Sequence, residues 1–560
     1  MEEAFRAAGV EKQEETSASR ASSRKSSGKP QKNIAKKPNR SKSRRPKKRK
    51  VYPDNSSTVN PWAEGRVKSP RPPQGKPANG YIVIGPNTRV NPGLCHDFDT
   101  KCIRADISGT FKDQNAEGPN PAMFTEMVLG LDFGTANTKV VVMEQGSQAA
   151  WAVPFTKDVN PYLIPSCVYK NEDEYTLLAS GQKLTDLKLP LLLDEKIESG
   201  HLDHIVAFLA LVIRYSRDWF FKEHGDIFPD TEFEWNYHIG LPASNFRDGK
   251  LVRRFKTLIA AAAELSLNQS DSISDIAVKS SVVSAHKAVT AEDRSDPRCE
   301  PQFTRVFPEI AAQLHGYVRS DRWDRNRPKF MLVDVGAGTV DACILNVTES
   351  SEGEIRYSFL KSSVQKQGVV MLHLARIDWI AECIARSAVT RTDLLDDLQK
   401  LSFSRDCTQP LPQSIADYLE NAEFPDTPNN ADKAFYNAYG KALWDGVISP
   451  VKTTIDPTLE QWKSLPFILC GGGSQHSLYR RFIQVINRGN SGSTLRLAPV
   501  RLRKPENLRC PGCPAEDYHR LSVAFGLAHW ELGEIFVEDD VEIYPRPTRD
   551  HPPMIGPEHV

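Results

Sequence analysis

A strand–glycine turn–strand pattern occurs twice in this sequence, and it limits the folds available to the chain. The first copy spans Met127 to Glu144 and the second spans Phe330 to Val347, each with two apolar runs around a glycine-containing turn. The aspartates that end the first run of each copy, Asp132 and Asp334, are 202 residues apart. A hairpin repeated at the spacing of a domain, among alternating strand and helix patterns, predicts two related α/β lobes.

The first copy carries side chains suited to phosphate and magnesium. Asp132 ends a strand, and Gly134 allows the backbone geometry of a tight turn. Thr135, Asn137 and Thr138 offer hydroxyl, amide and backbone N–H donors to phosphate oxygens. Asp132 can hold the water shell of Mg²⁺. Taken alone, the motif fits an ordinary hairpin turn equally well.

The second copy repeats this design, and a third glycine-rich segment follows it. The second copy contains, in order, Asp334, Gly336, Ala337, Gly338, Thr339 and Asp341. Two such turns facing each other could hold a triphosphate from both sides. The third segment, Gly471, Gly472, Gly473 and Ser474, lies between a predicted strand and a predicted helix. Its backbone can lie against a base or ribose, with the helix N-terminus directed at the ligand.

The order of these motifs resembles the superfamily of actins, sugar kinases and heat-shock chaperones, and within it the DnaK-type heat-shock branch most. The three segments look like its first phosphate loop, second phosphate loop and adenosine loop. Ile239–Ala243 resembles the branch's strand–turn–helix entry, and Val333–Asp341 resembles its second loop. Pro308–Ala312 lies where the branch has its connecting helix, and Val523–Ala528 resembles its closing helix.

The resemblance implies a two-lobed actin-like ATPase fold with duplicated ribonuclease-H-like lobes. Lobe I is expected over residues 125–327, and lobe II over 328–534 with a closing helix that returns to lobe I. Strands or hairpins are expected at Ser166–Ser180, Trp235–Ala243 and Pro466–Gly473. Helices are expected at His204–His224, Lys250–Leu267 and Ser477–Ile486.

The resemblance also implies Mg-ATP as the ligand and slow hydrolysis to ADP and phosphate. Asp132 and Asp334 would hold the metal through water, while Glu309 and Thr339 would position the attacking water. A lysine is expected at the terminal phosphate, with Lys188 preferred and Lys183 as the alternative.

The same resemblance leaves the biological role open among several classes of protein. The 26 residues after Glu534 leave no room for a chaperone's peptide-binding domain, so we expect a nucleotide-driven switch or scaffold. The alternatives are a filament-forming actin-like ATPase, a scaffold without catalysis and, with least support, a small-molecule kinase. The family's adenine-binding helix has no matching motif between Gly368 and Lys441, and the first loop is as similar to bacterial cell-shape actins.

The charge is divided unevenly along the chain. Residues 1–80 contain 21 Lys and Arg against 7 Asp and Glu, whereas the rest contains 51 against 64. This composition predicts a disordered basic tail over 1–80, an uncertain segment over 81–124 and an acidic, proline-rich tail over 535–560. Pro46–Val51 has the form of a nuclear import signal, and residues 20–51 could bind an import receptor, nucleic acid or an acidic membrane surface. A eukaryotic source favours import, and a bacterial source favours nucleic acid or a protein partner.

The cysteines and the hydropathy pattern indicate the compartment. Ten scattered cysteines favour a reducing environment, and neither a transmembrane run nor a secretory signal is evident, so a cytoplasmic protein is expected. Cys510 and Cys513, in the sequence Cys-Pro-Gly-Cys, form half of a zinc knuckle. Cys470, His476 and His519 lack the spacing of a second half, so a tight turn bearing two thiols is the alternative.

Overall fold

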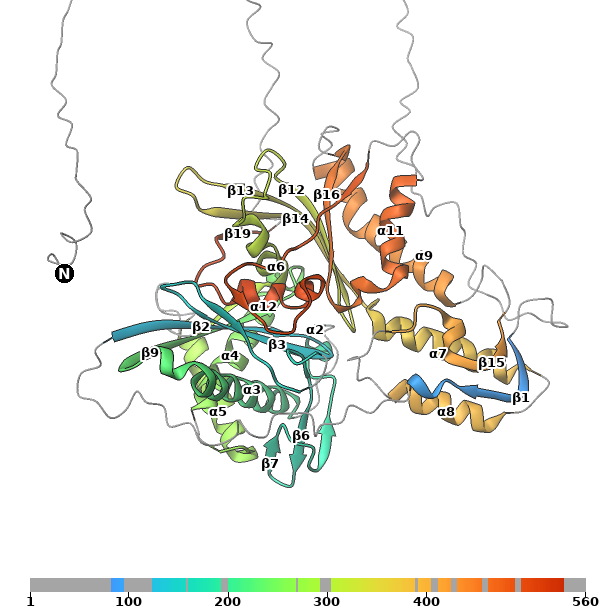
Figure 1. Cartoon of the computed structure of the whole chain (residues 1–560), viewed down its shortest axis with the longest axis horizontal. Helices are drawn as coiled ribbons and strands as arrows, with labels where there is room; N and C mark the ends of the chain where they lie inside the picture. The colour runs from blue at the N-terminus through green and yellow to red at the C-terminus, as the bar shows by residue number, and fades with distance from the viewer. Residues whose placement is uncertain are drawn as a thin grey trace, which may run out of the picture. The chain divides into compact units, whose positions relative to one another are not determined.

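The computed structural model describes residues 82–94, 123–157, 160–192, 200–267, 270–292, 304–387, 391–403, 411–424, 431–455, 462–488 and 495–537. The predicted basic tail, the Pro46–Val51 run and nearly all of the predicted acidic tail lie outside these ranges. Within them the chain is a mixed α/β protein with several mixed sheets, which confirms the predicted fold class at this level (Figure 1). No helix in the described part of the chain combines the length and apolar composition that a bilayer crossing needs.

Two large sheets share one strand order. The first runs β11 (Thr304–Pro308), β9 (Thr231–Leu241), β2 (Met123–Phe133), β3 (Asn137–Glu144), β4 (Ala150–Ala152) and β18 (Leu508–Arg509), with β5 (Ile164–Pro165) paired to β3. The second runs β17 (Leu497–Pro499), β16 (Leu465–Cys470), β12 (Lys329–Val335), β13 (Val340–Glu349), β14 (Ile355–Gln365) and β19 (Glu534–Phe536). In each, the middle hairpins are antiparallel and the outer pairs are parallel.

The central strands are apolar on both faces because both faces are covered. On β2, Met127, Leu129 and Leu131 belong to a core with α3 (His201–His224) and α4 (Gly249–Ser266). The opposite face of the first sheet packs on α12 (Ser522–Leu527). Continuous apolar strands of this kind are typical of sheets with helices on both sides.

Helices also cover the second sheet on both faces. One face packs on α6 (Glu309–Val318) and α12, and the other packs on α9 (Ala431–Leu443) and α11 (Ser477–Arg488). The remaining described helices are α2 (Leu189–Leu192), α5 (Asp275–Glu292), α7 (Val369–Ala385) and α8 (Thr392–Phe403). The predicted helices over 204–224, 250–267 and 477–486 are confirmed, as are the predicted hairpin of β6 (Val168–Asn171) and β7 (Glu174–Thr176) and the predicted strands at β9 and β16.

Two glycines allow α12 to approach its neighbours closely. A Cβ on Gly130 of β2 would lie 2.4 Å from the Ala524 carbonyl oxygen, and one on Gly526 would lie 1.9 Å from the Ala312 carbonyl oxygen of α6. Backbone atoms on both sides cannot move apart without opening the core. The small residues of the Val523–Ala528 motif are therefore needed for packing between α6 and β2.

We expect Gly526→Ala to destabilise the protein by about 3 kcal/mol, because the added methyl group overlaps the backbone of α6. Urea unfolding followed by circular dichroism measures this change. Gly225→Ala is the matched control, since Gly225 has a φ of −55° and no atom within 4 Å of an added Cβ. Equal stability of the two variants would contradict close packing of α12 on α6.

A segment from the uncertain region 81–124 joins a distant part of the fold. β1 (Val83–Val90) pairs antiparallel with β15 (Leu419–Glu423), more than 300 residues along the chain. The Arg391 guanidinium donates to the Gly85 and Thr88 carbonyl oxygens at 2.9 and 2.8 Å. The four-stranded sheet β10 (Ile273–Ser274), β7, β6 and β8 (Gln182–Leu184) completes the strands.

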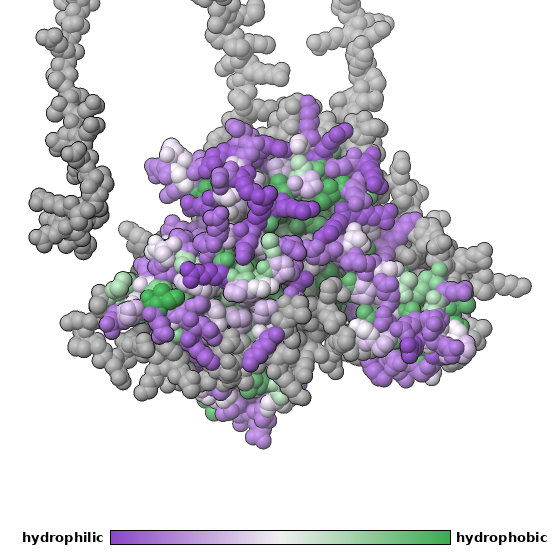
Figure 2. Space-filling view, viewed as in Figure 1, coloured by the Kyte–Doolittle hydropathy of each residue, from purple (hydrophilic) through white to green (hydrophobic). Residues whose placement is uncertain are grey.

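Hydrophilic residues dominate the described surface on the face in Figure 2, with smaller apolar patches between them. Exposed large apolar side chains include Met123 and Phe124 at the start of β2, and Ile276 and Val283 on α5. The polar surface agrees with the ordinary charged-residue content of the sequence.

Candidate functional site

The three glycine-rich segments meet at one cavity. Its volume is about 600 Å³, within the usual range of small-molecule sites. The predicted site residues that line it are Asp132, Gly134, Thr135, Asn137, Lys188, Glu309, Asp334, Gly336, Ala337, Thr339, Gly471, Gly472 and Gly473. Residues far apart in the sequence are thus brought to one place.

Three predicted binding residues do not line this cavity. Thr138 is fully buried, and its hydroxyl is hydrogen-bonded to the Ser166 hydroxyl at 2.9 Å. Gly338 packs against Thr135 and lines a smaller adjoining cavity. Ser474 is buried, and its carbonyl oxygen accepts from Arg480 Nε at 3.0 Å. The side chains of neighbouring residues in a strand or turn point to opposite sides. These three residues therefore face the protein interior, where they support the loops, while their neighbours face the cavity.

Strand register places a charged partner opposite each aspartate. In the first hairpin Asp132 faces Lys139, and Lys139 Nζ lies 2.9 Å from Asp132 Oδ2. In the second hairpin Asp334 faces Asp341 instead. The two hairpins therefore share a backbone design but differ in charge: one carries an ion pair and the other two carboxylates. Like charges directly opposite each other are unfavourable, so a cation or proton is favoured beside the second pair.

The second loop is held by the start of α7. The N–H groups of Gly368, Val369 and Val370 donate to the carbonyl oxygens of Gly338, Gly336 and Ala337 at 3.1, 3.1 and 2.9 Å. Peptide N–H and C=O groups point in opposite directions, so the N–H groups of Ala337 and Gly338 are left for an anion, while that of Gly336 donates to the Thr339 carbonyl oxygen at 2.9 Å. A Cβ on Gly368 would lie 2.2 Å from the Ala337 carbonyl oxygen, which requires glycine there.

A buried ion pair lines the cavity. Lys188 Nζ is 2.5 Å from Glu309 Oε1, and the Lys188 side chain is only 4% exposed. Gly240 makes room for Glu309, because a Cβ there would lie 2.6 Å from Glu309 Cγ. The predicted alternative, Lys183, is exposed on β8 and does not line the cavity.

Burial and mutual repulsion raise the pKa of the cavity carboxylates. Burial, reinforced by Glu309 and Asp132, raises the pKa of Asp334 to about 7. Burial and Glu309 raise the pKa of Asp341, and burial also raises the pKa of Glu309 despite its contact with Lys188. Carboxylates with raised pKa values in a cavity are typical of functional sites.

The third loop closes against the second aspartate. Gly471 has a φ of +80°, and a Cβ there would lie 1.9 Å from Asp334 Oδ1. Gln313, one turn after Glu309 on α6, donates from Nε2 to Asp334 Oδ2 at 3.3 Å. The Asp334 carboxylate is therefore fixed by a backbone contact on one side and an amide on the other.

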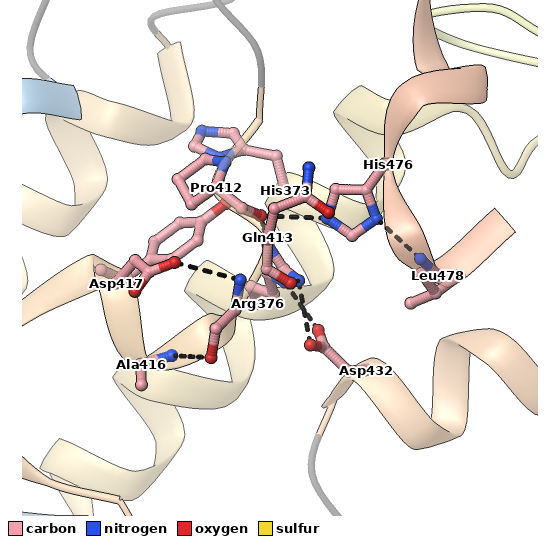
Figure 3. Close-up of polar contacts among 11 residues, drawn as sticks. His373, Arg376, Pro412, Gln413, Ala416, Asp417, Asp432, His476 and Leu478 are labelled. Atoms are coloured by element: carbon pink, nitrogen blue, oxygen red, sulfur yellow. Dashed lines mark hydrogen bonds and ion pairs between the residues drawn. The ribbon is translucent and has the colours of Figure 1, made fainter. Parts of the chain in front are cut away.

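Arg376 of α7 holds a further wall of the cavity (Figure 3). Its guanidinium donates to both Asp432 carboxylate oxygens at 2.6 and 2.9 Å and to the Pro412 and Gln413 carbonyl oxygens at 2.6 and 3.3 Å. The Gln413 side-chain oxygen accepts from Ser477 N at 2.9 Å, and Gln413 lines the cavity. Because that oxygen is occupied, the Gln413 amide NH₂ remains as a donor toward a ligand.

His476 anchors the same wall from the third loop. Its Nδ1 accepts from Leu478 N at 3.2 Å, so in the neutral ring Nε2 carries the proton and donates to the Pro412 carbonyl oxygen at 3.0 Å. Burial lowers the pKa of His476, which favours this neutral form. The segment from Leu411 to Tyr418 is thus fixed to α7, α9 and the third loop.

Sequence reasoning missed Lys139, Gln313, Ser166 and Gln413. Two of them had a signal: Lys139 is opposite Asp132 in any tight hairpin at Gly134, and Gln313 is one helical turn from Glu309. Ser166, whose hydroxyl donates to the Gly134 carbonyl oxygen at 2.7 Å, and Gln413 approach through tertiary contacts alone.

Comparisons with known proteins identify no relative from which the role of the site could be inferred. No protein-family model matches the chain, and no curated protein sequence is significantly similar to it. Across the ranges described by the structure, no three His, Cys, Asp or Glu side chains are grouped to hold a metal ion directly.

Proposed function

We propose that this chain is an actin-like ATPase of the heat-shock type that binds Mg-ATP and hydrolyses it slowly, acting as a nucleotide-driven switch or scaffold. The observation that carries the proposal is the meeting of Asp132, Asp334 and the Gly471–Gly473 loop at one cavity beside the Lys188–Glu309 pair. Their order along the chain follows the two phosphate loops and adenosine loop of that family.

The matching strand order of the two large sheets supports the fold assignment. Three antiparallel strands followed by two parallel ones occur in both, as expected of duplicated ribonuclease-H-like lobes. In each sheet a glycine-containing hairpin joins two neighbouring strands, β2 to β3 in the first and β12 to β13 in the second. Duplication would therefore place two similar turns on either side of one ligand.

The charges in the cavity support magnesium as an obligatory partner of the nucleotide. Six carboxylates outnumber the three Lys and Arg side chains that line the cavity. The carboxylates are those of Asp132, Glu309, Asp334, Asp341, Glu516 and Asp517, and the cations are Lys139, Lys188 and Arg520. A bare triphosphate would be repelled by this excess, and a divalent cation would offset it. Asp132 and Asp334 are the residues that would hold Mg²⁺ through water, and the ion would neutralise charge on the phosphates.

The residues of the chain would then do the following work. N–H groups of the two loops after Gly134 and Gly336 would bind phosphate oxygens, since those of Gly134 and Gly336 donate to the Asp132 and Thr339 carbonyl oxygens. Lys188 would neutralise the terminal phosphate. Glu309 accepts a hydrogen bond from the attacking water, with Thr339 on the opposite side. Catalysis rests on orientation and charge stabilisation, so slow turnover is expected.

Thermal unfolding of the full chain with Mg-ATP, Mg-ADP, Mg-GTP and ATP plus EDTA tests the proposal. A ligand at about 100 times its Kd adds about 2.7 kcal/mol to the free energy of unfolding. We expect the magnesium adenine nucleotides to raise the melting temperature, and ATP with EDTA to leave it unchanged. No shift with any nucleotide would overturn nucleotide binding, and a shift without phosphate release would leave a non-catalytic scaffold.

A filament-forming ATPase is the alternative reading, and it has a distinct signature. Light scattering would rise with Mg-ATP above a critical protein concentration, whereas a monomeric switch gives a flat signal. Sedimentation of the same samples separates filaments from amorphous aggregates.

A further inference from the structure

The Cys-Pro-Gly-Cys segment forms a tight turn with a thiol at each end. Cys513 N donates to the Cys510 carbonyl oxygen at 3.1 Å, and Gly512 has a φ of +78°. Pro511 followed by a glycine with positive φ is the sequence and geometry of a type II turn. Such a turn holds its end Cα atoms within about 7 Å, and disulfides need about 4.4–6.8 Å. The backbone is therefore already suited to a Cys510–Cys513 bond.

The two sulfurs interact with each other and with a cation. The Cys513 thiol and the Lys504 side chain are the neighbours that act on the charge of Cys510. The Cys513 hydrogen bond, with help from Lys504, lowers the pKa of Cys510 to about 7, while the pKa of Cys513 is raised. The pair therefore shares one proton near neutral pH, with the negative charge close to Lys504. A thiolate is the reactive form in thiol–disulfide exchange.

A zinc site does not account for this pair within the described ranges. A structural zinc site needs four ligands, and no third His, Cys, Asp or Glu joins the two thiols there. The remaining described cysteines, Cys167, Cys343, Cys383 and Cys470, are all buried. Cys513 alone is partly exposed, so this turn is the most accessible thiol site among the described residues.

Cys513 opens onto a small hollow with a cationic side chain. Tyr162, Asp517 and Arg520 line this hollow with Cys513, and the Tyr162 hydroxyl donates to the Pro511 carbonyl oxygen at 2.5 Å. Tyr162 thus fixes the turn from one side. Arg520 and Lys504 offer positive charge to an anionic reagent that approaches the exposed sulfur.

We propose that Cys510 and Cys513 form a redox-active dithiol that reacts with low-molecular-weight anionic disulfides and closes to an intramolecular disulfide. Cys513, the exposed sulfur, receives the reagent, and Cys510 is the resolving thiol. The proposal does not rest on nucleotide binding, although Asp517 and Arg520 line both this hollow and the proposed nucleotide cavity.

The reaction balances in two exchanges with a disulfide such as glutathione disulfide. In the first, Cys513 passes its proton to Cys510 and attacks one sulfur of the reagent, whose S–S bond breaks and releases one glutathione thiolate. In the second, Cys510 gives up that proton to the released thiolate and attacks the Cys513 sulfur. The mixed disulfide breaks, and the second glutathione leaves as a thiolate that takes the remaining proton from water. Two protein thiols are oxidised and one glutathione disulfide is reduced to two glutathione molecules.

The test is mass spectrometry of the full, folded chain after incubation with graded ratios of reduced to oxidised glutathione. We expect the mass to fall by two hydrogens, with the peptide containing Cys510 and Cys513 closed to a disulfide. Cys383, buried and with its pKa raised by burial, serves as the internal control and should stay reduced. Retention of both thiols at every ratio would overturn the proposal.

Two variants separate the roles of the thiols. Cys510→Ser should stop at the mixed disulfide and gain the mass of one glutathione at Cys513, because the resolving thiol is missing. Cys513→Ser should react at least about tenfold more slowly, because Cys510 is buried. Equal reactivity of both variants would contradict the assigned order. One zinc per chain that is lost in either variant would overturn the redox assignment in favour of a metal site.

Discussion

Asp334→Asn is expected to lower Mg-dependent ATP hydrolysis by roughly 100-fold or more and to remove the thermal stabilisation by Mg-ATP. Asparagine keeps the shape of the side chain beside Gly471 and can still contact Gln313, so the loops should stay in place. The change removes one of the two carboxylates proposed to hold the metal. Phosphate release measured at saturating Mg-ATP, together with a melting curve, gives both readouts.

In the absence of ligand, the same substitution should raise the melting temperature of the protein. The pKa of Asp334 in the folded protein is about 7, above the ordinary value of about 3.9. A carboxyl group with a raised folded pKa stabilises the fold below its unfolded pKa and loses that contribution as pH rises through about 7. The advantage of Asp334→Asn over the wild type in melting temperature should therefore grow from pH 5 to pH 8.

Asp397→Asn is the matched control for both effects, because Asp397 is an exposed carboxylate on α8 that is paired with Lys400 on the surface. It should leave hydrolysis and the pH profile unchanged. Undiminished hydrolysis in Asp334→Asn would remove Asp334 from the proposed metal site. If the melting temperatures of Asp334→Asn and the wild type changed with pH in parallel, burial of the Asp334 carboxylate would not destabilise the fold.

Local patterns were sufficient to predict the turns and the helices that follow them. Gly134 and Gly336 lie between apolar strands and Gly471 lies between a strand and a helix, positions that depend on neighbouring residues only. All three glycines line the cavity. Thr138 shows the limit of such reasoning: it belongs to the motif, but the pairing of β3 with β5 turns its hydroxyl toward Ser166. Strand partners decide which face of a hairpin is accessible.

Long-range contacts account for what the sequence could not predict. β1 pairs with β15, and neither strand indicates the other, because register between distant strands is set by the packed core. Gln413 is held at the cavity by Arg376, which binds the backbone of its segment and Asp432 of α9 together, and by the contact of His476 with Pro412. A helix motif between Gly368 and Lys441 could not indicate this wall of the cavity, because the wall is formed by a loop.

Lys188→Met is expected to destabilise the ligand-free protein by about 3–5 kcal/mol, because it leaves the Glu309 carboxylate buried without its cation. Glu309→Gln should cost less, since a neutral amide can still accept from Lys188. The double variant Lys188→Met/Glu309→Gln should recover much of the loss, because it removes both charges together. Urea unfolding of the three variants and the wild type forms a double-mutant cycle.

Nucleotide binding by the double variant separates the chemical role of the pair from its structural role. If Lys188 contacts the terminal phosphate, the folded double variant should lose affinity for Mg-ATP while retaining affinity for Mg-ADP, which lacks that phosphate. Hydrolysis should fall as well, because Glu309 no longer orients the attacking water. Equal loss of affinity for both nucleotides would instead place the pair away from the terminal phosphate, as a structural support of the cavity. Unchanged affinity and turnover would exclude Lys188 and Glu309 from the site, because their burial would then serve folding alone.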